Sequence, residues 1–184
     1  MDDPYRRISK REVYRNPWLA VEAHDIVHPT GVQGEHVLVC GGRASGVLVL
    51  QDQTFIFARQ PRFGARAMVL EIVKGGADDG ETPLACAKRE LREELGLQAA
   101  SWMPLGTTLE IPSIMDTPVE LFLATELSGV ETDLENVEEI TAVRMPVEEA
   151  YRAAIDGRID DAVTLAALLR YKLVNERSPS KGSP

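Results

Sequence analysis

The stretch from Gly75 to Leu97, GGADDGETPLACAKRELREELGL, decides how the centre of this chain folds. Thr82 is suited to cap a helix N-terminus, and Pro83 is preorganised for the first helical position. Gly96 suits the left-handed backbone conformation that commonly follows a helix C-terminus. The pattern therefore predicts a helix over 83–95. Its apolar stripe, which would pack on a core, consists of Leu84, Ala87, Leu91 and Leu95.

Three glutamates share another face of this predicted helix. Glu90, Glu93 and Glu94 are spaced i, i+3 and i+4, which places them side by side. Carboxylates this close repel one another, and oxygen ligands of this kind bind hard divalent cations such as Mg²⁺. The same spacing also occurs on solvated charged faces, where Arg89 would pair with Glu93. Spacing alone leaves both interpretations open.

A wider pattern of specified residues surrounds these glutamates. It runs Gly75, five residues, Glu81, seven residues, Arg89-Glu90-Leu91, one residue, Glu93-Glu94, one residue, Gly96-Leu97. This pattern matches the Nudix box at every specified position, so the chain resembles a Nudix hydrolase. The resemblance implies an α/β fold, an α/β/α sandwich around a mixed sheet, in which the box forms a loop, a helix and a loop. It also implies hydrolysis of a nucleoside diphosphate linked to another group, X.

By this resemblance, the box supplies a metal site for Mg²⁺, with Mn²⁺ able to substitute. Glu90 and Glu94 would be the main ligands, and Glu93 would bind directly or through a water. A further ligand would be the backbone carbonyl of Lys74 or Gly75, because a glycine backbone can approach a metal and phosphates closely. The resemblance thus implies an all-oxygen ligand set.

The catalytic roles follow from the same resemblance. Arg89 would hold the glutamates in place by ion pairing, and Glu93 would take part in catalysis beside the metal. A glutamate on the loop before the last strand would activate the attacking water. That loop offers Glu135, Glu138 and Glu139, of which Glu138 is the first candidate and Glu135 the second. A solvated acidic loop is the alternative interpretation of these glutamates.

Outside the box, residues 15–175 resemble the ADP-ribose pyrophosphatase branch of this family. Asn16-Pro17-Trp18-Leu19 resembles its N-terminal hairpin, where an aromatic side chain stacks on adenine, often across a homodimer. Trp18 would be that aromatic residue, unless it is simply packed. Gln60-Pro61-Arg62 resembles a segment whose arginine contacts the substrate's phosphates, a role that Arg59 or Arg66 could share. Pro112 lies near where this branch keeps a proline and is the remaining candidate for substrate binding.

Two departures from that branch concern the choice of substrate. The usual Pro-Ala-Gly before the box reads Val73-Lys74-Gly75, and the usual Ser-Pro-Gly has become Pro112-Ser113-Ile114-Met115. In having a lysine at position 74, the chain resembles the enzymes of a branch that acts on several ADP-linked compounds. The expected function is hydrolysis of ADP-ribose or related ADP-sugars to AMP and a sugar phosphate. The alternatives are pyrophosphatases for GDP-mannose, NADH or diadenosine polyphosphates, and a Nudix module that senses a nucleotide without cleaving it.

Composition favours a soluble protein over a nucleic-acid-binding or membrane protein. The 184 residues are 44% hydrophobic and 27% charged, which excludes a wholly disordered chain. The net charge of −9 argues against a large basic surface for nucleic acid. No apolar run approaches the roughly 20 residues that cross a bilayer, and the N-terminus lacks the apolar stretch of a secretory signal. We therefore expect a cytoplasmic protein with no nucleic-acid or membrane partner.

The order of predicted elements places an antiparallel β hairpin region before the Nudix domain. Strands are expected at 19–27, 36–40, 45–50, 54–59, 68–73, 102–111, 119–125 and 140–145. Closing helices are expected at 147–155 and 161–174, the second with an apolar stripe of Leu165, Leu168, Leu169 and Leu173. The expected domains are 1–44, an N-terminal β region that dimerises, 45–176, the Nudix hydrolase domain, and 177–184, a flexible tail.

Overall fold

A computed structural model describes residues 3–129 and 139–177. Within it the chain separates into two compact units. Unit 1 comprises Met1–Arg43 and Leu109–Pro118, and unit 2 comprises Ala44–Thr108 and Val119–Pro184. Residues 178–184, which make up nearly all of the predicted flexible tail, lie outside the described residues.

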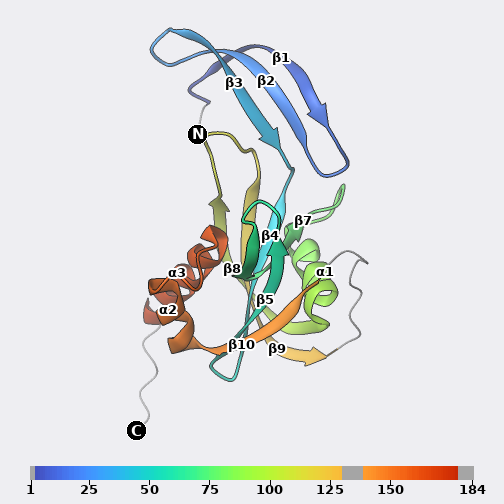
Figure 1. Ribbon diagram of the computed structural model, residues 1–184, viewed down its shortest axis with the longest axis vertical. Helices are drawn as coiled ribbons and strands as arrows, with labels where there is room; N and C mark the ends of the chain where they lie inside the picture. Colours follow the sequence, from blue (N-terminus) through green and yellow to red (C-terminus); the bar gives the residue numbers. More distant parts are fainter. Residues whose placement is uncertain (1–2, 130–138, 178–184) are drawn as a thin grey trace. The chain divides into compact units, whose positions relative to one another are not determined.

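Unit 1 is built on a three-stranded antiparallel sheet in the order β1-β2-β3. The strands are β1 (Arg6–Arg15), β2 (Ala20–Val27) and β3 (Gln33–Cys40) (Figure 1). The 109–118 segment joins this sheet, because the Val39 N–H donates to Ile114 O at 2.7 Å and the Asp116 N–H donates to Val39 O at 2.9 Å. The antiparallel N-terminal region is confirmed, with one more strand than the sequence predicts.

The additional strand, β1, has no apolar signature in the sequence. All ten of its residues are exposed, and the segment reads RRISKREVYR. Its conformation depends on its partner, since β1 pairs with β2 from Arg6 opposite Val27 to Arg15 opposite Ala20. A cross-strand ion pair between Lys10 and Glu22 adds to this pairing. A strand of this kind is determined by its neighbour rather than by periodicity, which is why the sequence does not reveal it.

Unit 2 contains a seven-stranded mixed sheet. Its strands lie in the order β10-β5-β4-β9-β8, while β6 pairs with β5 and β7 pairs with β4. β4 runs parallel to β9 and antiparallel to β5 and β7. The strands are β4 (Ala44–Gln51), β5 (Thr54–Arg62), β6 (Ala67–Glu71), β7 (Val73–Gly76), β8 (Leu97–Leu109), β9 (Pro118–Gly129) and β10 (Thr141–Pro146).

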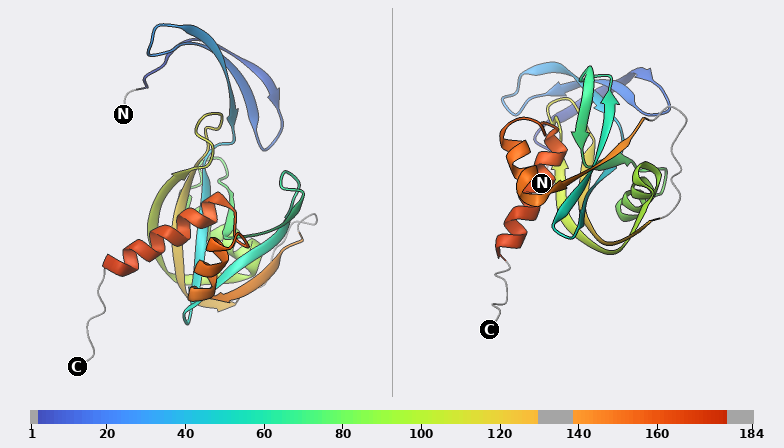
Figure 2. Two further views of the ribbon diagram at one scale, coloured as in Figure 1. Left: turned by 60° about the vertical axis from the view of Figure 1, so that its left-hand side comes forward. Right: turned by 60° about the horizontal axis from the view of Figure 1, so that its bottom comes forward.

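Helices cover both faces of this sheet: α1 (Pro83–Leu95), α2 (Val147–Ile155) and α3 (Ala162–Arg177). β4 shows how the layers form, because its successive residues face opposite sides. Val47 and Val49 lie in an apolar cluster with Leu91 of α1. Leu48 lies in a second cluster, with residues of α2 and α3. Figure 2 shows α1 on one side of the sheet and α2 and α3 on the other, which confirms the predicted α/β/α sandwich.

The limits of α1 and α2 are those that the sequence predicts, but the predicted apolar stripe of α3 is right only for Leu165 and Leu168, which pack on the core. Leu169 and Leu173 are 57% and 49% exposed, whereas Ala167 and Thr164 are fully buried. The Thr164 hydroxyl accepts the Ile72 N–H at 2.9 Å, which turns a face of small and polar residues toward the sheet. A count of leucines cannot predict that contact. Within the described ranges, no helix is long and apolar enough to cross a bilayer.

Candidate active site

Both ends of α1 are capped by residues of the box itself. At the N-terminus, Thr82 Oγ1 accepts the Ala85 N–H at 3.2 Å, and Pro83 occupies the first turn. At the C-terminus, Gly96 adopts a φ of 61°, and its N–H donates to Arg92 O at 2.9 Å. These caps confirm the helix signals in the sequence. They set where α1 begins and ends, while the packing of Ala87 and Leu91 on the core decides which side chains face away from the sheet.

Arg89 lies at the centre of the carboxylates on and before α1. Its NH1 group donates to Glu90 Oε1 at 2.7 Å and to Glu93 Oε2 at 2.9 Å. Its NH2 group donates to Glu81 Oε2 at 3.0 Å and to the Gly76 carbonyl at 2.7 Å. The hydrogen bonds from Arg89 lower the pKa of Glu81. Arg89 therefore bridges the glutamates of the box, which is the geometry its proposed role requires.

Gly75 lies directly against the Glu90 carboxylate. A side-chain carbon added at Gly75 would come within 2.1 Å of Glu90 Oε1, so only glycine leaves room for this carboxylate. The Cys86 thiol donates to the Gly75 carbonyl at 3.5 Å, and burial raises the pKa of that thiol to about 11, which keeps it protonated. The fold thus brings the end of β7 and the carboxylate face of α1 together.

The oxygen atoms around Gly75 suit a hard divalent cation. Glu94 is only 7% exposed, which is low for a carboxylate, and it lies one turn beyond Glu90 on the same face of α1. Within the described residues, no three Asp, Glu, His or Cys side chains already form a metal-binding group. A metal site here therefore stays a prediction, which rests on the chemistry of the expected donors, all of which are oxygen. These donors are the side chains of Glu90, Glu93 and Glu94 and the backbone carbonyl of Lys74 or Gly75.

A second charged cluster lies on the other side of β7, around Lys74. Lys74 Nζ is 2.5 Å from Asp161 Oδ1 and 3.2 Å from Glu71 Oε2. Glu71 is 1% exposed, and its other oxygen accepts hydrogen bonds from Arg62, through Nε at 2.8 Å and through NH2. Asp161 Oδ2 accepts the Thr164 hydroxyl at 2.6 Å and the Thr164 N–H at 2.9 Å. Each charge in this cluster has a partner of opposite sign.

Burial and pairing act in opposite directions on the two ends of the Lys74–Asp161 ion pair. Burial by itself would lower the pKa of Lys74, but the charges of Glu71 and Asp161 outweigh it and raise that pKa. Burial would raise the pKa of Asp161, but the charge of Lys74 outweighs it and lowers that pKa. Both groups are therefore charged at neutral pH, and the ion pair is intact there.

The three arginines expected to meet phosphates lie at the end of β5 and in the turn after it. Arg59 is exposed on β5, and Arg66 is exposed in the turn before β6, where its backbone adopts a φ of 54°. Arg62 is half-buried by its ion pair with Glu71. The structure therefore places all three on one β hairpin, while their contact with a substrate stays a prediction.

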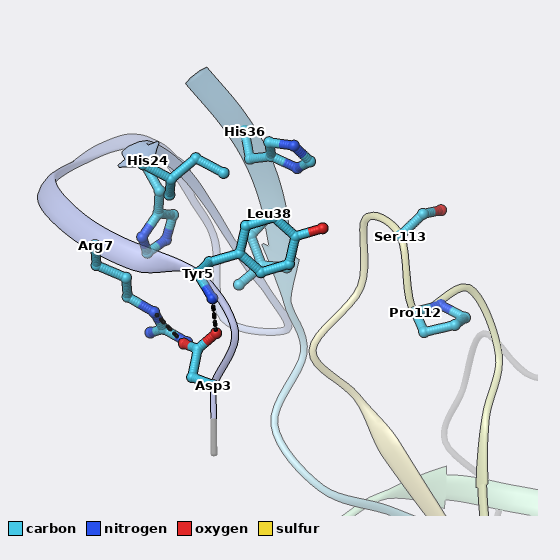
Figure 3. A pocket seen from close by; sticks show the side chains of 9 residues that line it. Asp3, Tyr5, Arg7, His24, His36, Leu38, Pro112 and Ser113 are labelled. Carbon is cyan, nitrogen blue, oxygen red and sulfur yellow. Dashed lines mark hydrogen bonds and ion pairs between the residues drawn. The ribbon is translucent and has the colours of Figure 1, made fainter. Parts of the chain in front are cut away.

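The two other candidate substrate residues, Trp18 and Pro112, belong to unit 1. Trp18 lies between β1 and β2 and is 80% exposed, so it is not packed within its own chain. Pro112 lines a cavity of about 320 Å³ in this unit. Figure 3 shows Tyr5 and Leu38 on one side of this cavity and Pro112 with Ser113 on the other. The substrate roles of Trp18 and Pro112 remain predictions.

The candidates for the general base, Glu138 and Glu135, lie outside the described residues. Glu139, from the same loop, is described and is exposed just before β10. The identity of the base therefore also stays a prediction.

The cluster around Lys74 is the feature of the site that sequence reasoning missed. One signal could have indicated it: Glu71 interrupts the apolar segment 68–73, and a carboxylate in a buried strand requires a cationic or hydrogen-bonding partner. Asp161, however, is 87 residues from Lys74 in the chain. No spacing rule connects residues that far apart, so only the fold identifies this partner.

Comparison with known proteins identifies the family of this chain. Residues 41–168 match the NUDIX domain, and residues 5–39 match the nucleoside diphosphate sugar hydrolase N-terminal domain. The chain is 27% identical over 171 residues to an ADP-ribose pyrophosphatase of Bacillus subtilis, an alignment covering 91% of this chain and 92% of that protein. It is 30% identical over 166 residues to a CMP-5'-(N-acetyl-N-hydroxy-3-aminopropyl)phosphonate hydrolase of Streptomyces rubellomurinus, covering 87% and 78%.

The fold is also similar to a solved structure. The crystal structure of ADP compounds hydrolase matches with a TM-score of 0.84 over 95% of this chain and 96% of that chain, at 22% sequence identity. At this identity the match shows the fold alone. Because the NUDIX match spans most of the chain and includes the complete box, this chain belongs to the Nudix hydrolase family.

Proposed function

We propose that this chain hydrolyses the pyrophosphate bond of nucleoside diphosphate-linked compounds, with ADP-ribose or related ADP-sugars as the first candidates. The observation that carries the proposal is the carboxylate face of α1 lying against Gly75, whose added Cβ would be 2.1 Å from Glu90 Oε1. Hydrolysis of a pyrophosphate adds water across its P–O–P bridge, and for ADP-ribose the products would be AMP and ribose 5-phosphate. Carboxylates beside an accessible backbone carbonyl suit the divalent cation that such reactions use.

The box would hold Mg²⁺, or Mn²⁺ in its place. The proposed ligands are Glu90, Glu94, Glu93 directly or through a water, and the carbonyl of Lys74 or Gly75. A bound cation would offset the charge of the pyrophosphate and lower the pKa of a water. Arg89 contributes before any ligand binds, because its hydrogen bonds of 2.7 and 2.9 Å keep the Glu90 and Glu93 carboxylates in one orientation.

The attacking water must also lose a proton, and we assign that role to Glu138, with Glu135 as the second candidate. Single substitutions to Gln, each followed by a pH–rate profile, test this assignment. Loss of the base should lower kcat strongly and remove the acidic limb of the profile. Normal profiles in Glu138→Gln, Glu135→Gln and Glu139→Gln would move the role to a glutamate of the box.

Substrate phosphates would meet the arginines on the hairpin of β5 and β6. Arg59 and Arg66 are exposed there, and Arg62 is oriented by two hydrogen bonds to Glu71. Planar guanidinium groups suit phosphate oxygens because they can donate two hydrogen bonds at once. We propose Trp18 and Pro112 as further substrate contacts, with the indole of Trp18 stacking on the base. The 80% exposure of Trp18 leaves its ring open to such a ligand.

The relatives support a nucleoside diphosphate compound as the class of substrate more strongly than they support one particular base in that substrate. One is named for ADP-ribose and another for a CMP-linked phosphonate, at similar levels of identity. Adenine comes first because one relative that the chain matches over 92% of that protein's length is named an ADP-ribose pyrophosphatase. The base preference therefore needs a direct comparison of substrates.

A panel of ADP-ribose, ADP-glucose, GDP-mannose, NADH and diadenosine polyphosphates, with and without Mg²⁺, tests the proposal. 8-oxo-dGTP and an mRNA cap are added as substrates of other kinds. Products are detected as phosphate released by a coupled phosphatase. We expect metal-dependent turnover that is fastest with ADP-ribose or an ADP-sugar. Turnover of only 8-oxo-dGTP or an mRNA cap would contradict the branch, and nucleotide binding without any turnover would favour a sensor module.

We also propose that the chain acts as a homodimer in which Trp18 reaches the partner's substrate. An exposure of 80% is unusual for a tryptophan in a monomeric protein. Size-exclusion chromatography with light scattering at micromolar concentration should show a dimer. A monomer under those conditions would contradict the role of Trp18 across an interface.

A further inference from the structure

Strand β7 presents its residues to two different helices. Val73 lies in the apolar cluster that contains residues of α1, and Gly75 faces Glu90 of the same helix. Lys74, between them, pairs with Asp161 at the start of α3. Successive residues of an extended strand alternate in this way. Lys74 and Gly75 are therefore adjacent residues of one strand that contact opposite sides of it.

Asp161 is itself held in one orientation. Its Oδ2 accepts both the hydroxyl and the N–H of Thr164, at 2.6 and 2.9 Å, and the Thr164 hydroxyl oxygen accepts the Ile72 N–H at 2.9 Å. Its Oδ1 faces Lys74 Nζ at 2.5 Å. These contacts form a closed ring from Ile72 through Thr164 and Asp161 to Lys74, which follows Ile72 by two residues in the chain.

Glu71 holds Lys74 from a second direction. Its Oε2 is 3.2 Å from Lys74 Nζ, and its Oε1 accepts hydrogen bonds from Arg62. With 1% exposure, this carboxylate is withdrawn from water, so its cationic partners are costly to remove. Lys74 is thus held between two carboxylates, of which Asp161 is the nearer.

We propose that Asp161 is a positioning residue for the metal-binding segment: by holding Lys74, it keeps the Lys74–Gly75 backbone in place against Glu90. The inference rests on the proposed function, in which that backbone supplies a carbonyl ligand. All other proposed ligands come from α1. The residue that caps the start of α3, far from the box in the chain, would thereby set the affinity of a site to which it contributes no ligand.

The test is Asp161→Asn, which keeps the size of the side chain and its capacity to cap α3 but removes the charge that pairs with Lys74. The matched control is Asp156→Asn, because Asp156 pairs with Arg158 at 3.1 Å in the same closing segment but on an exposed surface. Mn²⁺ binding is measured by the electron paramagnetic resonance signal of free Mn²⁺, and thermal unfolding is followed on the same samples.

We expect folded Asp161→Asn to bind Mn²⁺ roughly tenfold more weakly than the wild type, as when an outer partner of a metal ligand is lost. Asp156→Asn should bind as the wild type does. Indistinguishable Mn²⁺ binding by folded Asp161→Asn and the wild type would overturn the inference.

A second pair of variants applies if Asp161→Asn does not fold. Thr164→Val removes the hydroxyl that orients Asp161 while keeping the shape of the side chain, and Thr164→Ser keeps that hydroxyl. We expect weaker Mn²⁺ binding in Thr164→Val and recovery in Thr164→Ser. Equal binding by the two variants would overturn the inference, because a purely packing role does not distinguish Val from Ser by a hydroxyl.

The wild-type protein separates a failure of this inference from a failure of the proposed function. If the wild type binds Mn²⁺ and hydrolyses a pyrophosphate, and Asp161→Asn binds Mn²⁺ equally well, only the positioning role is wrong. If the wild type neither binds Mn²⁺ nor hydrolyses any member of the panel, the proposed function is wrong and the positioning role falls with it.

Discussion

Two charged clusters lie on opposite sides of β7, and they differ in the balance of their charges. Around Lys74, two cations meet two carboxylates, because Lys74 and Arg62 pair with Glu71 and Asp161. Around Arg89, one guanidinium contacts the carboxylates of three glutamates, and a fourth glutamate of the box lies buried on α1. The two clusters are separated by a single strand.

This difference indicates what each cluster does. In a buried cluster with balanced charges, each charge is paired within the cluster, and the ion pairs join the strands and helices that carry these residues. A cluster with excess carboxylates retains repulsion that a divalent cation relieves. The first should therefore support the fold and the second the chemistry. Substitutions in the carboxylate-rich cluster should lower activity with little loss of stability. Substitutions in the balanced cluster should lower stability and weaken metal binding only indirectly, through β7.

The largest expected effect is on activity, from Glu94→Gln in the carboxylate-rich cluster. The substitution removes a charge from a buried residue without changing its shape, so Mg²⁺-dependent hydrolysis should fall by more than about 100-fold while the melting temperature changes little. Glu148→Gln, at an exposed position on α2, is the control. Activity near the wild-type level in Glu94→Gln would show that the carboxylate excess has another purpose.

Substitution in the balanced cluster should lower the stability of the fold, and Lys74→Met tests this expectation. Removal of this cation leaves Asp161 and the 1%-exposed Glu71 short of positive charge, which should cost about 3 kcal/mol in the free energy of unfolding. Urea unfolding measures this loss. Lys88→Met, at an exposed position on α1, should cost less than about 0.5 kcal/mol. Equal costs for the two variants would mean that the cluster around Lys74 contributes no more than a surface charge.

Gly75→Ala affects the carboxylate-rich side through geometry rather than charge. The new Cβ would come within 2.1 Å of Glu90 Oε1 and must displace that carboxylate, so turnover should fall roughly 10- to 100-fold. The neighbouring Gly76→Ala meets nothing within 4 Å and serves as the control. Equal activity of the two variants would mean that the position of the Glu90 carboxylate does not affect catalysis.

The pH dependence of stability should reveal how much the Lys74–Asp161 ion pair contributes to the free energy of unfolding. The folded pKa of Asp161 is lowered, so the pair contributes stability above the ordinary pKa of about 3.9 and loses it as pH falls through the folded pKa. The folded pKa of Lys74 is raised, so the alkaline loss begins only above its ordinary value of about 10.4. The stability difference between wild type and Asp161→Asn should therefore be largest at neutral pH.

Urea unfolding at a series of pH values measures that difference. It should narrow steadily on acidification, because protonation of Asp161 in the wild type removes the same charge that the substitution removes. A difference that stays constant between neutral and strongly acidic pH would mean that the ion pair contributes nothing and that the substitution acts through shape.

The smallest expected effect lies in the helix that supplies the glutamates. Thr82→Ala removes the cap that accepts the Ala85 N–H at 3.2 Å and should cost about 1 kcal/mol of stability. Thr82→Ser, which keeps the hydroxyl, should recover most of it. Turnover per folded molecule should be unchanged in both variants. A large fall in turnover with unchanged stability would place Thr82 in the site rather than in the scaffold of α1.

Local signals in the sequence were sufficient for α1 and its glutamates. Thr82, Pro83 and Gly96 act on backbone atoms within a few residues. Their effect can therefore be predicted from residues that are close together in the sequence. β1 lacked such a signal, because its exposed, charged residues become a strand only by pairing with β2. Leu169 and Leu173 of α3 were predicted to be buried and are not, for a related reason. The contact of Thr164 with Ile72 helps to choose the buried face, which apolar content alone does not determine.

The sequence by itself determined the helix of the box, the face on which its glutamates gather and the family to which the chain belongs, because caps and helical spacing act locally. The tertiary structure decided what lies on each side of β7. Only the folded chain brings Gly75 against Glu90 and joins Lys74 to Asp161 across 87 residues. Contacts at that separation depend on how strands and helices pack, and packing is a property of the whole chain.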